Sequence, residues 1–418
     1  MNLPPILAAL RKHKSGVVLI ALQIALTLAI VCNAVFIIAD RIDRVNRPTG
    51  LDESNLMLVT QQFVDAPSAN DPEGARQLDN LIVQDASALK QVPGVSHVVP
   101  VNSMPLLRSA WNGGVATRPD TSFHGRTNIM SSFYFMGQEG LDTLGLKLVA
   151  GRNFHASEIN TMTLRSQVHA AGVLITQALA EKLFPDASAL GKTIYLNGST
   201  SPTTVLGIVQ RMQVPGVSNW AEGFAWNSVI LPQRMDAFFS RYAVRVKPGQ
   251  MDAVRKALVP ALYKVNPMRV LDDDSVQTFA EIRADAYKGD VGMAILMGII
   301  CVILIAITGA GIVGLTSFWV GQRRRQIGVR RALGARKVDV LRYFQLENFI
   351  ISGIGAVVGI ALAVGLNLWL MQHMSMARLP IFIVILGVVL VLALGQAAVF
   401  GPARRAANVS PVVATRGV

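Results

Sequence analysis

The chain has 418 residues, of which 51% are hydrophobic and only 16% are charged, and its mean hydropathy is +0.42. Soluble domains average about 25% charged residues, so this composition indicates a membrane protein. It excludes a disordered chain, a collagen-like fibre and, with two cysteines, a small disulfide-rich secreted module. A net charge of +13 would suggest nucleic-acid binding in a soluble protein, but the positions of the basic residues favour another explanation.

Four stretches without Asp, Glu, Lys or Arg are each long enough to span a bilayer. A hydrocarbon core roughly 30 Å thick needs about 20 apolar residues in a helix. Buried helices of a soluble protein are the alternative, but these are usually shorter and carry charged residues. We therefore predict four transmembrane helices, at residues 15–39, 291–322, 348–377 and 379–403.

The excess of basic residues orients these helices. It lies mainly before the first stretch, in residues 323–347 (the basic loop) and in the tail 404–418. The basic loop has eight basic residues against two acidic ones, whereas the segment 40–290 is balanced. The positive-inside rule then places both chain ends and the basic loop in the cytoplasm, and residues 40–290 outside.

Residues 1–14 resemble the start of a cleaved signal peptide. The apolar stretch after them is too long for a signal peptide, and no clear small-residue cleavage site follows it, so we expect a retained anchor. Apolar residues followed by Arg11 and Lys12 predict a short cytoplasmic interfacial helix within residues 1–14.

The predicted spans contain no Asp, Glu, Lys or Arg, and His373 lies at the outer end of the third. Ion-coupled transporters place ionisable groups near the middle of the membrane, so the sequence argues against a secondary transporter and an intramembrane hydrolase. The amides and hydroxyls that remain are expected to form hydrogen bonds between helices. They are Gln23, Thr27, Asn33, Asn367 and Gln396.

Three glycines are predicted to lie where helices pack closely. Gly355 and Gly359 form a G-x-x-x-G pattern in the third stretch, and Gly311 lies in a glycine-rich part of the second. This spacing lets two helix backbones approach each other, within one chain or between two subunits.

The segment 40–290 has a mixed α/β pattern. Alternating residues predict strands at 55–64, within 94–107, at 240–246 and at 268–271, and helical spacing predicts helices at 74–92, 251–265 and 275–287. In the central stretch 145–215, strands are predicted at 171–175, 192–197 and 203–209, with a helix at 176–184.

We therefore predict an α-helical membrane protein with four transmembrane helices and a large extracytoplasmic α/β domain containing a β-rich inserted lobe. The inserted lobe is residues 145–215, and residues 50–144 with 216–275 form the surrounding lobe.

No catalytic or metal-binding motif is found. Leu190–Thr193 reads LGKT, but Asp186 stands where a phosphate-binding loop needs glycine, and a strand is predicted to follow where a helix is required. The run Asp272–Asp274 could hold a cation, but it is more typical of a solvated helix start. We expect no catalytic residues, cofactor or metal in this chain, which is predicted not to be an enzyme.

The basic loop offers a surface for a cytosolic partner. On an uninterrupted helix, Val329, Leu333, Val340 and Phe344 would lie on one side; alternatively, Gly334 ends one helix before another begins. Alternatively, the basic residues only fix the orientation of the chain in the membrane. The apolar residues between the arginines favour docking on a cytosolic protein.

Residues 324–335, RRQIGVRRALGA, resemble the signature R-R-x-E-I-G-[IV]-R-R-A-L-G-A of FtsX/MacB-type ABC-transporter permeases. The tail GPARRAA at 401–407, followed by SPV at 410–412, is similar to the ending of that family. LVAGRNF at 148–154 and the segment 173–192 resemble elements of its outer domain. Gln326 departs from the pattern, since the family usually has Glu there, and the change removes a charge at the presumed contact.

The resemblance implies a dimer of permease subunits, homomeric or heteromeric, docked on two ABC ATPase subunits that bind the ATP. It implies two outer lobes, porter and sabre, and an inner-membrane location in bacteria. Family members couple ATP hydrolysis to movement of the periplasmic domain (mechanotransmission) for efflux or export of drugs, peptides or lipoproteins. Whether a periplasmic adaptor and an outer-membrane channel also bind is left open.

The same resemblance implies which residues dock on the ATPase. They are Arg324, Arg325, Gln326, Ile327, Arg330, Arg331, Ala332, Leu333, Gly334 and Ala335. The alternative function is a membrane receptor or regulator whose outer domain binds a ligand or a cell-wall hydrolase.

Overall fold

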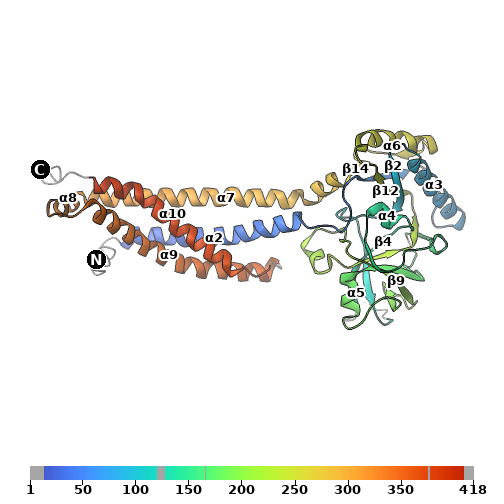
Figure 1. Cartoon of the computed structure of the whole chain (residues 1–418), viewed down its shortest axis with the longest axis horizontal. Coiled ribbons are helices and arrows are strands. Elements are labelled where there is room, and N and C mark those ends of the chain that lie inside the picture. Colours follow the sequence, from blue (N-terminus) through green and yellow to red (C-terminus); the bar gives the residue numbers. More distant parts are fainter. Residues whose placement is uncertain (1–13, 120–127, 165, 375–376, 409–418) are drawn as a thin grey trace. The chain divides into compact units, whose positions relative to one another are not determined.

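The computed structural model describes residues 14–119, 128–164, 166–374 and 377–408, which divide into two units (Figure 1). The membrane unit contains Met1–Asn46 and Gly289–Val418, and the α/β unit contains Arg47–Lys288. The predicted interfacial helix within residues 1–14 and most of the tail 404–418 lie outside the described residues.

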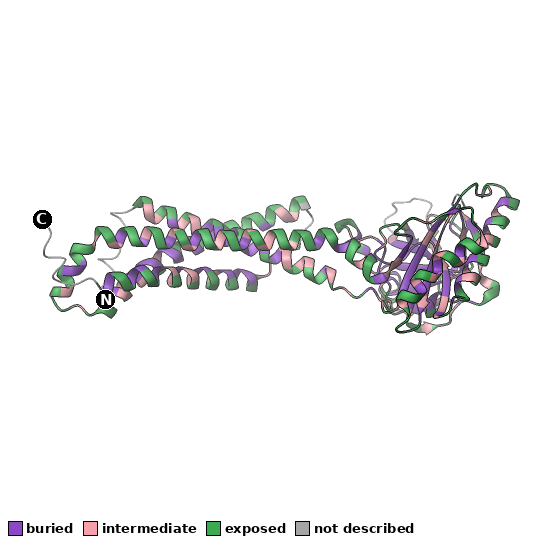
Figure 2. Cartoon of the chain, turned by 90° about the horizontal axis from the view of Figure 1, so that it is seen from above, coloured by how far each residue is buried: buried purple, intermediate pink, exposed green. Residues whose placement is uncertain are grey.

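Four long helices carry the four predicted apolar stretches. They are α2 (Lys14–Val45), α7 (Phe279–Gln322), α9 (Lys337–Met374) and α10 (Ile381–Ala407), and each is long and apolar enough to cross a membrane. Within the membrane unit α2, α9 and α10 pack against one another, whereas most of the apolar part of α7 is exposed. Figure 2 shows exposed residues along much of these helices and buried residues gathered inside the sheets of the α/β unit.

Polar side chains of the long helices bond to neighbouring segments, as the sequence predicted. The pairs and their donor–acceptor distances are Gln23 to the Ile307 carbonyl, 3.0 Å; Thr27 with Thr308, 2.7 Å; Asn33 to the Ala363 carbonyl, 3.1 Å; Gln396 to the Gln345 carbonyl, 3.4 Å; and the Leu379 amide to Asn367, 3.0 Å. Each bond satisfies a group that hydrocarbon cannot solvate.

The three predicted packing glycines all face another helix of the same chain. A Cβ atom on Gly355 would lie 2.8 Å from the carbonyl oxygen of Ala21, and one on Gly359 would lie 2.9 Å from Leu28. Both contacts are with α2. On α7, a Cβ atom on Gly311 would lie 2.6 Å from the amide of Gln23.

The first lobe of the α/β unit is an antiparallel sheet in the order β13-β1-β12-β2, with β14 also paired to β1. The strands are β1 (Leu56–Phe63), β2 (Val95–Val101), β12 (Phe239–Val246), β13 (Arg269–Val270) and β14 (Val276–Thr278). Helices α3 (Pro72–Lys90) and α6 (Met251–Val265) share its apolar core. Pro100 lacks an N–H donor, and β2 accommodates it as an edge strand.

An ion pair lies wholly inside this core. Arg269 donates two hydrogen bonds of 2.8 Å to the carboxylate of Asp85, and Tyr242 donates a third of 2.9 Å. Both charged side chains are fully buried, and the pair holds α3 and β13 together. Removing either partner would leave the other charge buried without a counter-charge.

The second lobe is a small closed sheet. Strands β9, β7, β10, β4, β3 and β8 pair in that order, β8 pairs back to β9, and β5 extends β9. They are β3 (Trp111–Ala116), β4 (Ile129–Phe135), β5 (Leu148–Gly151), β7 (Gly172–Thr176), β8 (Thr193–Leu196), β9 (Thr203–Val209) and β10 (Ser228–Leu231). The short helices of the unit are α4 (Gly140–Leu144), α5 (Gln177–Leu183), η1 (Ala156–Glu158) and η2 (Asn219–Phe224).

This lobe is larger than the predicted insertion at residues 145–215. Strands β3, β4 and β10 belong to it, although the sequence placed them in the surrounding lobe. Gly113 and Gly114 weaken the strand pattern of β3. The parallel pairing of β4 with β10 joins segments far apart in the chain, which periodicity cannot reveal.

Helix α7 begins later than predicted. Residues 276–278 form β14, and the helix starts at Phe279 behind a capping box. The Glu281 carboxylate accepts the amide of Thr278 at 2.7 Å, and the Thr278 hydroxyl accepts the amide of Glu281 at 3.2 Å. From this cap one helix continues to Gln322.

A two-stranded parallel sheet joins β6 (Asn160–Thr163) to β11 (Gln233–Asp236). Arg234 of β11 donates two hydrogen bonds, of 2.7 and 2.9 Å, to Asp79 of α3. Asp236 is buried next to them, and one of its carboxylate oxygens has no hydrogen-bond partner among the described residues. Burial, with the charge of Asp79, raises the pKa of Asp236 to about 7.

Gly355→Ala is expected to destabilise the membrane unit by about 1–3 kcal/mol, because the new methyl group meets the backbone of α2. Gly353→Ala on the same helix is the matched control. It meets no atom within 4 Å, and alanine is a better helix former by roughly 1 kcal/mol. Thermal unfolding in detergent measures both, and equal midpoints would contradict the packing role.

Asp236→Asn is expected to flatten the pH dependence of stability. The folded chain holds this proton up to about pH 7, against an ordinary pKa of 3.8, so stability decreases as pH rises between those values. Urea unfolding of the full chain across this range measures the slope. Exposed Asp186→Asn should leave the slope unchanged, and an unchanged slope in Asp236→Asn would count against the buried proton.

Candidate functional site

The basic loop folds into a short helix and a turn between α7 and α9. Helix α8 spans Arg324–Ala332, and α9 begins at Lys337. Gly334 has φ +97°, its amide donates to the Arg331 carbonyl at 3.2 Å, and the Ala335 amide donates to the Arg330 carbonyl at 3.1 Å. This is a Schellman cap, which needs a left-handed residue after the helix. The alternative that Gly334 ends one helix is confirmed, and the uninterrupted helix is wrong.

One side of α8 faces the rest of the membrane unit. Ile327 is only 6% exposed and belongs to the same apolar cluster as Val340 and Phe344 of α9 and Ala403 of α10. Ile327 was predicted to dock on a partner, but its side chain is already used to hold α8 in place. The docking role of Ile327 stays a prediction.

Two of the predicted docking arginines are also engaged inside the chain. Arg331 donates a 2.6 Å hydrogen bond to the carbonyl of Ala407, the last residue of α10. A cation is favourable there because the carbonyls at a helix C-terminus carry partial negative charge. The guanidinium of Arg330 lies 5.5 Å from the ring centroid of Tyr343, within range of a cation–π interaction.

The opposite side of the loop is open. Leu333, at the turn, is 84% exposed, and Val329 and Val338 beside it in the sequence are 44% and 51% exposed. The remaining predicted residues are exposed, except that Ala335 is half-buried; they are Arg324, Arg325, Gln326, Ala332 and Gly334. An apolar tip surrounded by guanidinium groups suits a partner with an apolar groove and acidic rim.

Sequence reasoning missed the ion pair that holds this site. Arg323, between α7 and α8, donates to both carboxylate oxygens of Glu347 in α9 at 3.0 Å, and their side chains are only 13% and 3% exposed. The pair ties the start of α8 to α9. A signal was present, because Glu347 is an acid directly at the border of an apolar stretch, where an unpaired charge is unfavourable.

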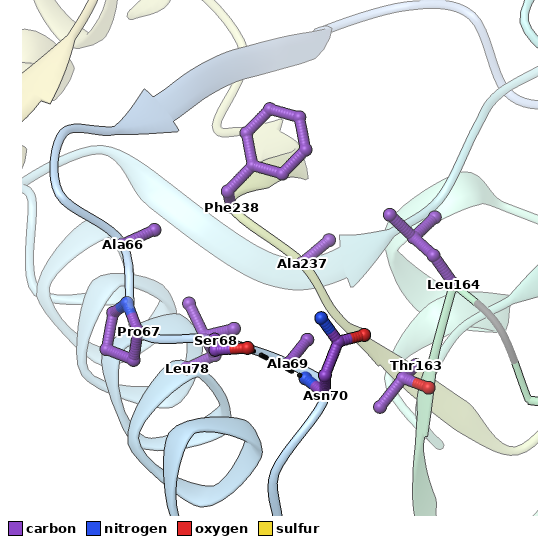
Figure 3. Close-up of a pocket in the computed structure, with 10 residues that line it drawn as sticks. All are labelled: Ala66, Pro67, Ser68, Ala69, Asn70, Leu78, Thr163, Leu164, Ala237 and Phe238. Atoms are coloured by element: carbon purple, nitrogen blue, oxygen red, sulfur yellow. Dashed lines mark hydrogen bonds between the residues drawn. The ribbon is translucent and has the colours of Figure 1, made fainter.

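We searched the described residues of the α/β unit for a metal site or a binding cavity. No group of three or more His, Cys, Asp or Glu among them could hold a metal ion. A cavity of about 320 Å³ lies between the loop Ala66–Asn70, Thr163 with Leu164, and Ala237 with Phe238 (Figure 3). Its lining contains hydroxyl and amide groups but no charged side chain.

Glu347→Gln is expected to destabilise the membrane unit by about 3 kcal/mol, because it leaves the partly buried Arg323 without its counter-charge. The double variant Arg323→Met with Glu347→Leu removes both charges and should recover most of the loss. Thermal unfolding in detergent measures both variants. A single variant as stable as the parent chain would show that the pair is not required.

Two family models match the chain. The family model described as MacB-like periplasmic core domain matches residues 18–261, more than half of the chain, and the FtsX-like permease C-terminal model matches residues 298–411. The second match contains the whole basic loop.

Relatives include a macrolide export ATP-binding/permease protein, MacB, of Neisseria meningitidis, 25% identical over 80% of this chain and 49% of that protein. MacB of Chromobacterium violaceum is 26% identical over 68% of this chain and 43% of that protein. The chain spans about half the length of the curated relatives it matches. The crystal structure of the periplasmic region of MacB from Actinobacillus actinomycetemcomitans covers 58% of this chain and 97% of that one, with 16% identity and a TM-score of 0.35.

The two family models follow one another along the chain in the order of its α/β unit and its later membrane helices. The chain therefore belongs to the MacB/FtsX-type family of ABC-transporter permeases, with a MacB-like periplasmic core domain followed by an FtsX-like permease region.

Proposed function

We propose that the chain is the transmembrane subunit of an ABC transporter that couples ATP hydrolysis on a separate cytoplasmic ATPase chain to movement of its own periplasmic domain. The basic loop is the docking site for the ATPase. The observation that carries this proposal is the open side of the loop, where Leu333 is 84% exposed between arginines on a turn held rigidly by its other side.

The bracing of α8 supports a role in transmitting force. Ile327 packs in the cluster shared with α9 and α10, Arg331 binds the end of α10, and Arg323 binds α9. A partner that displaces α8 would therefore move these helices as well, since packed elements shift as rigid bodies. Helix α7 ends one residue before α8 and is a single helix from Phe279 onward.

The interior of the membrane unit supports mechanotransmission over conduction. Among the described residues, each amide or hydroxyl that the sequence singled out makes at least one hydrogen bond to a neighbouring segment. We infer that cargo is handled on the periplasmic side, as in efflux or export of drugs, peptides or lipoproteins. The relatives are named for macrolide export, which supports export of a drug among these cargo classes.

The charge distribution supports an inner-membrane location with the basic loop and both chain ends in the cytoplasm. We also propose a second permease subunit, identical or not, beside this one, as the family resemblance implies. Gln326 is exposed on α8 and leaves the family's usual carboxylate absent from the docking face, which favours pairing with a non-identical subunit.

The double variant Arg324→Glu with Arg325→Glu, and separately Leu333→Ala, are expected to weaken binding of the ATPase chain by roughly tenfold or more. Neither change touches the braced side of α8. Co-purification with the ATPase from membranes, and ATPase rates in proteoliposomes, measure the effect. Exposed Lys256→Glu on α6 is the control, since it reverses a charge in the other unit.

Insertion into the membrane should be unchanged in all three variants. Undiminished ATPase binding in both loop variants would contradict the docking role. If no ATP-hydrolysing chain co-purifies and a kinase does, the receptor alternative is favoured.

A further inference from the structure

The α/β unit presents an exposed tryptophan that the proposed function does not use. Trp220 lies on η2 and is 62% exposed, whereas Ala221 and Phe224 of the same turn are buried in a small cluster with Val214. The indole packs edge-on against Phe224, with 4.8 Å between ring centroids. Trp220 is therefore a large, exposed apolar group on a fixed support, and its surroundings decide whether it has a partner.

The segment that contains Trp220 is bonded to both ends of the α/β unit. Arg47, the first residue of the unit, pairs with Glu222 at 2.8 Å, and the Thr49 carbonyl accepts the amide of Gln213 at 2.8 Å. Toward the other end, the side chain of Gln213 donates to the Tyr287 hydroxyl at 3.2 Å. Residues 213–222 thus lie beside both places where the chain continues into its apolar helices.

The distances along the helices place Tyr287 within the headgroup layer and Arg47 just beyond it. Tyr287 is four residues before Val291, where the apolar stretch begins, or roughly 6 Å along α7. Helix α2 continues six residues past Ala39, or roughly 9 Å, and Arg47 follows its end at Val45. The headgroup layer adds roughly 5–7 Å to each side of the hydrocarbon core.

Basic side chains surround the same turn. Arg211 lies 4.7 Å and Arg47 5.8 Å from the ring centroid of Trp226, and the Lys182 ammonium donates to the Gly223 carbonyl at 3.4 Å. The acid of the turn, Glu222, is already paired with Arg47. Tryptophan with Lys or Arg is the combination that holds proteins at the membrane–water interface.

We propose that η2 anchors the α/β unit to the phospholipid surface, with the Trp220 indole among the headgroups and Arg211 and Lys182 facing lipid phosphates. The partner is the bilayer itself. The anchor is independent of any ATPase, so it can fail while the proposed function stands.

Fluorescence quenching of the full chain in nanodiscs of phosphatidylcholine and phosphatidylglycerol tests the anchor. The fluorescence of Trp220 is obtained as the difference in emission between the parent chain and the Trp220→Phe variant. This variant keeps an aromatic ring against Phe224. The matched control is the same difference measured for Trp111→Phe. Trp111 lies in β3 and packs on Phe135. Lipids with a nitroxide close to the headgroup should remove most of the Trp220 signal and leave the Trp111 signal unchanged. Aqueous iodide should quench Trp220 only weakly.

Strong iodide quenching of Trp220 without lipid quenching would overturn the proposal, because the ring would face water. Protection from both quenchers would also overturn it, since protein, such as a second copy of the chain, would then cover the ring. Arg211→Gln with Lys182→Gln should reduce the lipid quenching of Trp220. If this variant is quenched as fully as the parent, the two cations have no part in the anchor.

Discussion

Hydrocarbon offers no hydrogen-bond partner to a polar group, and the organisation of this chain depends on that constraint. The polar side chains singled out within the long helices bond to neighbouring segments, and the charges gather where the helices end. At one such end, Arg323 and Glu347 neutralise each other while nearly buried. Their pairing fixes where α8 leaves α7, and so it sets which side of the basic loop remains open.

The basic loop therefore has two sides with different tasks. Ile327, Arg323 and Arg331 belong to the inner side and hold α8 against α9 and α10. Leu333 and the arginines at the start of α8 belong to the open side, which is available to a partner. The sequence analysis treated residues 324–335 as one continuous contact. The helix instead places some of these residues against α9 and α10 and leaves others exposed for a partner.

The α/β unit also contains buried charged side chains. Arg269 and Asp85 are fully buried in the first lobe and satisfy each other with two hydrogen bonds. Asp236 is buried beside the like charge of Asp79, and burial together with that charge raises its pKa to about 7. A buried carboxylate of this kind is favourable only where a counter-charge and hydrogen bonds accompany it, as at the Asp85–Arg269 pair.

Composition, charge distribution and periodicity were sufficient for the four long helices, for the polar residues within them that form hydrogen bonds, and for the main strands and helices of the first lobe. These features depend on the pattern of apolar and polar residues along a single helix or strand, so neighbouring residues are enough to predict each of them. The closed sheet of the second lobe, the Arg323–Glu347 and Asp85–Arg269 pairs and the inward position of Ile327 were decided by tertiary structure. Each of these joins segments distant in the chain, and no periodic pattern states which distant residue will be the partner.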